Sequence, residues 1–372
     1  MFESIEQTIE QLRAEQYLCD RKLATVAFLA LQMRKPILIE GPAGVGKTEL
    51  AKVVAAALGR LLIRLQCYGG LDQDRALYEW EYGKQLLYTQ ILRDKISRLF
   101  EGANDLHEAV EQLHLHEDVF FSEHFIVRRP ILQAISSTDP VVLLIDELDR
   151  AEEQFEAFLL EVLSDFQVTI PEIGTVKATT IPYVIITSNN TRDLSDALKR
   201  RCLHLFIGYP DEQRELEIVR MKVPALRETL AAQVVAVIRR LRALDLRKAP
   251  SISETLDWAQ ALVLLNADTL TPALLEETLH LLIKYERDTQ QVNEQLRWIV
   301  ESIQPQSQPG DLADRQDRAA RPVAPTATEV PLRPSLRPAE PDMNYLEQRR
   351  QEHTARYFTS YRGRTDGRTG ES

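Results

Sequence analysis

A short apolar run at 36–40 leads into a glycine-rich turn at 41–46, and Lys47 and Thr48 follow directly before a helical pattern at 49–58. Glycine permits positive φ and lets backbone N–H groups approach anionic oxygens. The lysine supplies a point charge, the hydroxyl can ligate Mg²⁺, and the helix N-terminus adds partial positive charge. The spacing GxxxxGK[ST] in this context predicts a phosphate-binding loop, and the alternative is a chance glycine turn. The expected nucleotide contacts are Gly41, Pro42, Ala43, Gly44, Val45, Gly46, Lys47, Thr48 and Glu49.

Two carboxylates, Asp146 and Glu147, follow five apolar residues at 141–145, a run that predicts a buried parallel strand. The carboxyl ends of such strands form the edge at which open α/β sheets bind ligands. Asp146 is predicted to hold Mg²⁺ through water, with Thr48 as the second ligand, and Glu147 to polarise the attacking water. Alone, the pattern is also typical of a solvated acidic turn. The preceding phosphate loop favours a site for ATP and Mg²⁺.

A further buried strand is predicted at 183–190, and it ends in Asn189 and Asn190. An asparagine at this strand end, beside the two carboxylates, could orient the hydrolytic water. By itself an Asn-Asn pair is more typical of a turn.

Three basic side chains, Lys199, Arg200 and Arg201, end a short predicted helix at 196–201. Cations in a last helical turn commonly do no more than offset the helix dipole. The functional interpretation is an arginine finger, donated across a subunit boundary to the γ-phosphate held by a neighbour. Such a finger contributes about 10³–10⁵ to the rate by stabilising transition-state charge.

The composition is that of a globular chain of 372 residues, 44% apolar and 27% charged, with length for two folded domains. A formal net charge of −11 argues against a general electrostatic grip on nucleic acid, which is therefore not an expected partner. Three widely spaced cysteines fit a reduced, cytoplasmic setting. We expect neither a signal peptide, because the first residues are acidic, nor a membrane span, because no apolar run reaches about 20 residues.

The rest of the chain divides by composition. Residues 1–34 are predicted to be helical and to pack beside the phosphate loop, closing over the adenine. A second strand is predicted at 61–67, a charged helical insertion at 85–129, an amphipathic helix at 155–163, and a hairpin with a Pro/Gly-marked turn at 167–176. The histidines of the insertion lack a metal-ligand spacing and are interpreted as solvated or locally paired: His107, His114, His116 and His124.

Helical periodicity alone fills 210–302, which predicts a small all-helical domain with helices at 211–222, 226–245, 253–266 and 272–287. Residues 303–372 are rich in proline and arginine and are predicted to be a disordered tail. Its aromatic residues alternate with arginine, which fits either a docking peptide or an idle tail.

These motifs together resemble the AAA+ ATPases of the MoxR class, over about 30–300. The segments that carry the resemblance are GPAGVGKTEL, LLIDELDRAEEQFEAFLLEVLSDFQVTI, VIITSNNTRDLSDALKRRC and the helical lid. The run from DELDR to DALKRRCLHLF is similar to a subgroup that includes the accessory ATPase of carbon monoxide dehydrogenase maturation. The resemblance implies a ring oligomer, usually a hexamer, that acts with a von Willebrand A-domain protein on a client metalloenzyme.

The resemblance also implies residue roles. Lys47 and Thr48 match the Walker A motif, and Asp146 and Glu147 match Walker B. Sensor 1 falls on Asn189, with Asn190 as competitor, and the arginine finger falls on Arg201, with Arg200 as substitute. The hairpin near Pro171 and Gly174 resembles a pore-facing insert.

Two features depart from the class. Ser253 stands where the sensor-2 arginine is expected, so another residue such as Arg247 or Lys248 would have to couple the lid to the γ-phosphate. The insertion at 85–129 is also longer than expected.

The sequence thus predicts an α/β chain: a P-loop core with a parallel sheet (1–209), a helical lid (210–302) and a tail (303–372). The favoured function is an ATP-driven remodelling enzyme that assists metalloenzyme maturation. A nucleic-acid-remodelling AAA+ motor is the first alternative, and a nucleotide-gated adaptor without useful turnover is the second.

Overall fold

The structure, a computed structural model, describes residues 2–91, 123–171 and 173–301. The body of the insertion with His107, His114 and His116 lies outside these residues, as does the predicted tail from 302 onward. None of the helices within the described residues is long and apolar enough to cross a membrane.

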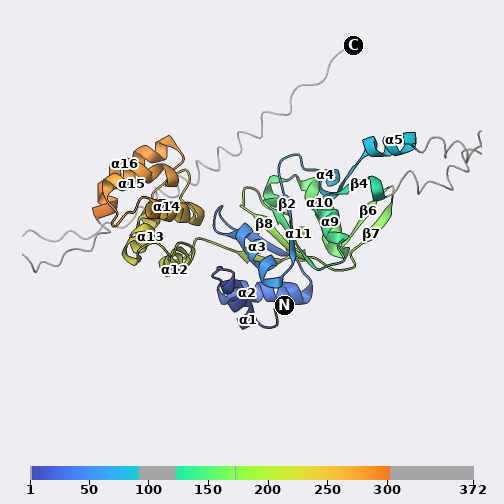
Figure 1. The fold of residues 1–372 in the computed structure, drawn as a ribbon, viewed down its shortest axis with the longest axis horizontal. Helices are drawn as coiled ribbons and strands as arrows, with labels where there is room; N and C mark the ends of the chain where they lie inside the picture. The colour runs from blue at the N-terminus through green and yellow to red at the C-terminus, as the bar shows by residue number, and fades with distance from the viewer. Residues whose placement is uncertain (1, 92–122, 172, 302–372) are drawn as a thin grey trace, which may run out of the picture. The chain divides into compact units, whose positions relative to one another are not determined.

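The core is a five-stranded parallel sheet in the order β2-β5-β8-β1-β9 (Figure 1). The two central strands β5 and β8 are buried along their whole length, as their unbroken apolar sequences predict. The registers align the carboxyl ends: Gln66 lies opposite Asp146, and Glu40 lies opposite Ser188. The strands are β1 (Ile37–Glu40), β2 (Leu61–Gln66), β5 (Val141–Asp146), β8 (Tyr183–Ser188) and β9 (Leu203–Phe206).

Helices cover both faces of the sheet because alternate strand residues point to opposite sides. Val142 and Leu144 face one hydrophobic cluster, and Leu143 and Ile145 face the other. The first cluster packs against α1 (Ile5–Ala14), α2 (Arg21–Met33) and α3 (Lys47–Leu58). The second packs against α4 (Gln73–Leu77), α9 (Pro130–Ile135), α10 (Glu153–Asp165) and α11 (Asp196–Arg201). This three-layer arrangement confirms the predicted α/β P-loop core.

The insertion is wrongly predicted at its C-terminal end, where the expected helix is a strand. Strand β4 (Ile126–Arg128) pairs antiparallel with β3 (Tyr78–Trp80). The reason is local: β-branched Ile126 and Val127 suit a pleated pair and lie opposite Trp80 and Glu79. Of the residues between the two strands that the structure describes, 82–91 form α5 (Tyr82–Ile91) and 123–125 form the 3-10 helix η1 (Glu123–Phe125).

The hairpin predicted at 167–176 is confirmed. Strands β6 (Gln167–Ile170) and β7 (Gly174–Lys177) pair antiparallel after α10, with Gly174 at φ 96°. The short 3-10 helix η2 (Leu148–Arg150) connects β5 to α10.

Residues 212–301 are largely helical, as predicted, and their helices surround the buried Trp258. One prediction is wrong: the helix expected at 272–287 ends at Leu282, and a further helix follows. The break is stabilised by the buried carboxylate of Asp288 in that further helix, which accepts the backbone N–H groups of Arg247 and Lys248. The helices are α12 (Glu212–Lys222), α13 (Glu228–Ala243), α14 (Ile252–Leu264), α15 (Pro272–Leu282) and α16 (Glu286–Glu301).

Candidate nucleotide site

The glycine-rich turn between β1 and α3 has the backbone that the sequence predicts. Gly44 and Gly46 lie at φ 73° and 95°, where a side chain would be strained. Gly46 is the N-cap of α3 and offers no side-chain hydrogen bond to the first helical N–H groups. These N–H groups therefore remain available to an anionic oxygen, which is the arrangement that binds phosphate.

Lys47 is 6% exposed, and its ammonium group is held inside the loop. Its Nζ donates to the carbonyl oxygens of Gly41 and Pro42, each at 2.7 Å, and to Oδ1 of Asn189 at 2.8 Å. Burial lowers the pKa of Lys47, and the carboxylates of Asp149, Asp146 and Glu147 oppose that shift.

Asp146 and Thr48 are the two residues predicted to hold Mg²⁺, and they lie together. The Thr48 hydroxyl is 3.0 Å from Oδ1 and 3.2 Å from Oδ2 of the Asp146 carboxylate, which is buried. A hydroxyl and a carboxylate from the helix start and the strand end are the hard oxygen donors that Mg²⁺ prefers. The pair therefore fits that ion.

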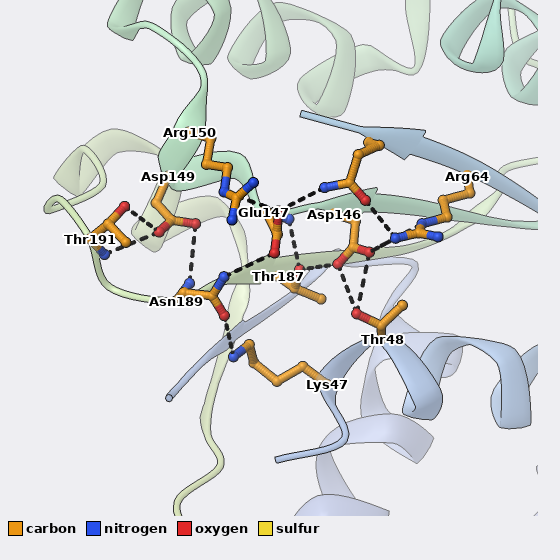
Figure 2. Close-up of polar contacts among 11 residues, drawn as sticks. Lys47, Thr48, Arg64, Asp146, Glu147, Asp149, Arg150, Thr187, Asn189 and Thr191 are labelled. Carbon is orange, nitrogen blue, oxygen red and sulfur yellow. Dashed lines mark hydrogen bonds and ion pairs between the residues drawn. The ribbon is translucent and has the colours of Figure 1, made fainter. Parts of the chain in front are cut away.

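Glu147 directly follows β5 and sits at φ 56°, in the left-handed region. Oε1 accepts the Asn189 amide at 3.2 Å, and Oε2 accepts the Gln66 amide at 2.9 Å and pairs with Arg150 at 3.1 Å (Figure 2). Its N–H donates to the Thr187 hydroxyl. The carboxylate is thus held beside the position of the phosphates, where a general base belongs.

The structure separates the two asparagines at the end of β8. Asn189 bridges Lys47 and Glu147 (Figure 2). Asn190 lies at φ 58°, and its N–H donates to Ser188, so it forms the turn. The amide that contacts the phosphate-binding and acidic residues is therefore that of Asn189.

Asp149 was not predicted as a site residue, yet it is buried and fixes the turn that carries Asn189. It accepts the backbone N–H of Asn189 at 3.1 Å and both the N–H and the hydroxyl of Thr191. Burial alone would raise the pKa of Asp149, but these hydrogen bonds outweigh it and hold the pKa below its usual value. The sequence signal for Asp149 was a further acidic residue three positions after Asp146, in the run DELD.

Three further polar residues around Asp146 were also missed: Arg64, Gln66 and Thr187. Thr187 donates to Oδ1 of Asp146 at 2.6 Å, and Arg64 donates to Oδ2 from Nη2 at 2.6 Å and from Nε at 3.1 Å. Arg64 and Gln66 stand two apart in the predicted strand LLIRLQ, so they share one face. That spacing was the sequence signal for them.

The two candidate finger residues do not join this group within one chain. Arg200 and Arg201 are exposed and make no hydrogen bond or ion pair with any described residue. Their neighbour Lys199 instead pairs with Glu40 at 3.7 Å. Because both guanidinium groups are exposed and have no such partner among the described residues, either could contact another molecule.

Beside the phosphate loop lies a cavity of about 600 Å³, a size that suits a small-molecule ligand. Its walls come from the α1–α2 connection with Tyr17, from the loop at 44–46, from 205–211, and from α12 and α14. The predicted packing of residues 1–34 beside the loop is therefore confirmed. That they close over an adenine stays a prediction, for which this cavity is the candidate place.

Neither proposed substitute for the sensor-2 arginine lines this cavity. Arg247 stacks over the Tyr285 ring at 4.3 Å, and Lys248 pairs with Glu254 at 2.9 Å. Ser253 does line the cavity, as expected of its position. The basic residues that α12 places there are Arg214 and Lys222.

Residues 37–209 match the family model described as "ATPase family associated with various cellular activities (AAA)". The parallel sheet order and the P-loop between β1 and α3 agree with this match, and the matched segment is an AAA ATPase domain.

Two curated relatives are gas vesicle ATPases. GvpN of Ancylobacter aquaticus is 25% identical over 243 residues, which cover 63% of this chain and 62% of that protein. GvpN1 of Halobacterium salinarum is 25% identical over 224 residues, which cover 57% of this chain and 58% of that protein. The chain therefore spans less than two thirds of the length of these relatives.

Among solved structures, the chain is similar to the RuvB Holliday junction branch migration motor of Thermotoga maritima. The TM-score is 0.41 at 16% identity, over 74% of this chain and 71% of that one. A variant of the same motor gives a TM-score of 0.39 at 16% identity, over 70% and 67%. TM-scores this low do not define a shared fold, so the fold assignment rests on the sheet order and the family match.

Proposed function

We propose that this chain hydrolyses ATP at a site completed by a second copy of itself, and that the cycle remodels or assembles another protein. The observation that carries the proposal is the contact of Asn189 with both Lys47 and Glu147, at 2.8 and 3.2 Å. One amide there joins the predicted phosphate-binding cation to the predicted base. Lys47, Glu147 and Asn189 belong to three separate sequence motifs, so the contact depends on the fold and on no single motif.

In the proposed reaction, the N–H groups at the start of α3 and the Lys47 ammonium bind the β- and γ-phosphates. Thr48 and Asp146 hold Mg²⁺, which neutralises charge on the phosphates when bound. Glu147 accepts the proton of the attacking water, and Asn189 orients that water and the γ-phosphate. Asp149 keeps the Asn189 turn in place through its hydrogen bonds.

The second copy supplies the missing cation. Arg201, or Arg200 in its place, stabilises the charge that develops on the γ-phosphate of the neighbour. Support comes from the exposure of both guanidinium groups and from their lack of partners among the described residues. Head-to-tail donation completes every site only when the copies close into a ring, for which we propose a hexamer.

The client of the proposed ATPase is a protein assembly. The two relatives are named for gas vesicles, and the resemblance to the MoxR class implies a von Willebrand A-domain partner and a metalloenzyme client. We propose the metalloenzyme with its A-domain partner as the first client to test, in the cytoplasm. The β6–β7 hairpin is the proposed client-facing element.

The first experiment measures ATP hydrolysis by the purified chain at increasing protein concentration, with and without DNA or RNA. Because the finger comes from a second copy, specific activity is expected to rise with concentration and polynucleotide is expected to have no effect. Specific activity that is constant down to the monomer would overturn the shared site, and strong stimulation by polynucleotide would favour a nucleic-acid motor.

A second experiment separates hydrolysis from nucleotide-gated binding. Glu147→Gln is expected to retain ATP binding and to lose about 10²–10⁴ in hydrolysis rate, because a positioned base contributes that much. Glu161→Gln, at an exposed position on α10, is the control and should match the wild type. A Glu147→Gln chain that still matures its client would show that the protein is an adaptor.

A further inference from the structure

Arg64 on the edge strand β2 holds the carboxylate that is predicted to bind Mg²⁺. Its guanidinium donates to Oδ2 of Asp146 through two nitrogen atoms, at 2.6 and 3.1 Å. The Asp146 side chain is 2% exposed and that of Arg64 is 48% exposed. A half-exposed cation is therefore bound to a buried anion, and it can withdraw into water at a smaller cost than the anion can.

The acceptor capacity of Asp146 is fully used in this arrangement. Oδ1 accepts Thr187 at 2.6 Å and Thr48 at 3.0 Å, while Oδ2 accepts both Arg64 nitrogen atoms. A carboxylate offers about four lone-pair sites. Water molecules that join a Mg²⁺ ion to Asp146 need some of these sites. They can obtain them only if one of these donors gives up its hydrogen bonds, and Arg64 is half-exposed whereas Thr187 is buried.

Arg64 is also joined to the predicted base. Its Nη2 donates to Oε1 of Gln66 at 2.5 Å, and the amide nitrogen of Gln66 donates to Oε2 of Glu147 at 2.9 Å. The bond from Arg64 fixes which end of the Gln66 amide faces Glu147. One guanidinium thus contacts the metal-binding carboxylate directly and the base through one side chain (Figure 2).

We propose that Arg64 is a metal-responsive positioning residue: it occupies Asp146 until the metal–nucleotide complex binds, and its release frees Gln66 and thereby Glu147. This inference rests on the proposed function, because it assumes that ATP and Mg²⁺ bind at this site. The physical reason is charge. A guanidinium beside Asp146 repels an incoming dication and competes with it for one carboxylate.

A structural role for Arg64 predicts the opposite sign. If Arg64 only held Asp146 in position, its removal would weaken metal binding or leave it unchanged. If Arg64 competes with the metal, its removal strengthens metal binding. The expected change is about fivefold, which corresponds to the loss of one partly exposed ion pair.

The test uses the full chain in excess over a non-hydrolysable ATP analogue and titrates Mn²⁺, with free Mn²⁺ followed by electron paramagnetic resonance. Arg64→Gln is expected to bind Mn²⁺ about fivefold more tightly than the wild type. Arg64→Lys keeps the charge and should lie between the two. Gln66→Ala should change Mn²⁺ affinity less than Arg64→Gln does, because Gln66 acts on Asp146 only through its bond with Arg64. Arg75→Gln on α4 is the control for loss of a surface arginine.

A second readout is the Mg²⁺ concentration at half-maximal hydrolysis, which Arg64→Gln should lower by the same factor. Weaker or unchanged Mn²⁺ binding by Arg64→Gln, with normal binding by the wild type, would overturn the inference and leave the proposed function intact. A wild-type chain that binds no analogue would overturn both. Thermal melting of each variant checks folding, and Arg64→Lys keeps the test decisive if Arg64→Gln does not fold.

Discussion

The phosphate end of the nucleotide site and its nucleoside end are built in different ways. At the phosphate end, side chains from β2, β5, β8 and the start of α3 meet at one sheet edge and are joined by hydrogen bonds (Figure 2). At the nucleoside end, a cavity of about 600 Å³ is enclosed by segments that are distant in sequence. The phosphate end is therefore defined by a hydrogen-bonded network of side chains, and the nucleoside end by the shape of its cavity.

This difference decides what a substitution should do at each end. Within a buried polar network, the loss of one partner leaves others unsatisfied, so effects on hydrolysis are large. In a cavity between helices, the loss of one contact should lower nucleotide affinity only by the free energy which that contact contributes. The predictions below test this contrast, from the largest effect to the smallest.

The largest effect is expected outside both ends, at the surface that would meet a second copy. Replacing Arg200 and Arg201 together by alanine should lower hydrolysis by about 10³-fold or more, because a finger stabilises only the transition state. Nucleotide affinity should stay close to the wild type. Arg13→Ala on α1 is the control, since Arg13 is also exposed. Steady-state hydrolysis and equilibrium nucleotide binding are measured on each variant.

A double variant that hydrolyses ATP at the wild-type rate would show that one chain contains the whole catalytic group. A single variant of each arginine then decides which of the two acts. The finger should lose nearly the full factor alone, whereas the other should lose little.

At the phosphate end, Asp149→Ala should lower hydrolysis by about 10- to 100-fold, because Asn189 loses the support of its backbone and a small displacement there is costly. The control is Asp193→Ala, an exposed aspartate on the same loop. Because the pKa of Asp149 is lowered in the fold, its contribution to stability is complete above the unfolded pKa and is lost as the pH falls through the folded value. Equal activity of the two variants would contradict the role of Asp149.

The contrast between the two ends also explains how much the sequence could predict. Lys47, Thr48, Asp146 and Glu147 each belong to a short motif in which neighbours in sequence define the chemistry. Arg64 belongs to none, since its role depends on the register that places β2 beside β5. Sheet order and register are properties of the assembled core, and no local pattern carries them.

The same reasoning applies to the elements that were predicted wrongly. The strand at 126–128 exists because it pairs with 78–80, almost fifty residues earlier. The helix boundary at Leu282 depends on Asp288, whose carboxylate binds the backbone of Arg247 and Lys248. Both features are set by tertiary contacts, which outweigh the local helical periodicity.

At the nucleoside end, Gly44→Ala tests how closely the lid approaches the phosphate loop. A Cβ on Gly44 would lie 2.1 Å from the Ser251 hydroxyl, and φ is 73°, so the variant is both strained and obstructed. Gly59→Ala is a matched control, because Gly59 has φ 62° and no atom within 4 Å of its Cβ position. We expect about tenfold weaker nucleotide binding for Gly44→Ala and no change for Gly59→Ala. If the two variants lost the same affinity, the loss would come from backbone strain at positive φ and not from the contact between Gly44 and Ser251.

The smallest effect concerns Glu254, which caps the helix that lies over Gly44. Burial alone would raise the pKa of Glu254, but hydrogen bonds from Lys248 and Ser251 outweigh it and hold the pKa at about 2, against 4.5 for a free glutamate. A lowered folded pKa means that the stabilisation is present above pH 4.5 and is lost as the pH falls toward 2.

Glu254→Gln should therefore cost about 1–2 kcal/mol of unfolding free energy at pH 7, once solvent screening at the half-exposed Lys248 is allowed for. The difference from the wild type should shrink as the pH approaches the folded pKa. Urea unfolding at pH 7, 4 and 3 measures it, with the exposed Glu277→Gln on α15 as the control. A difference that stays constant over this range would show that Glu254 acts by packing. The nucleoside end would then depend on the shape of its cavity and not on the charged contact between Glu254 and Lys248, unlike the phosphate end, where charged side chains are joined by hydrogen bonds.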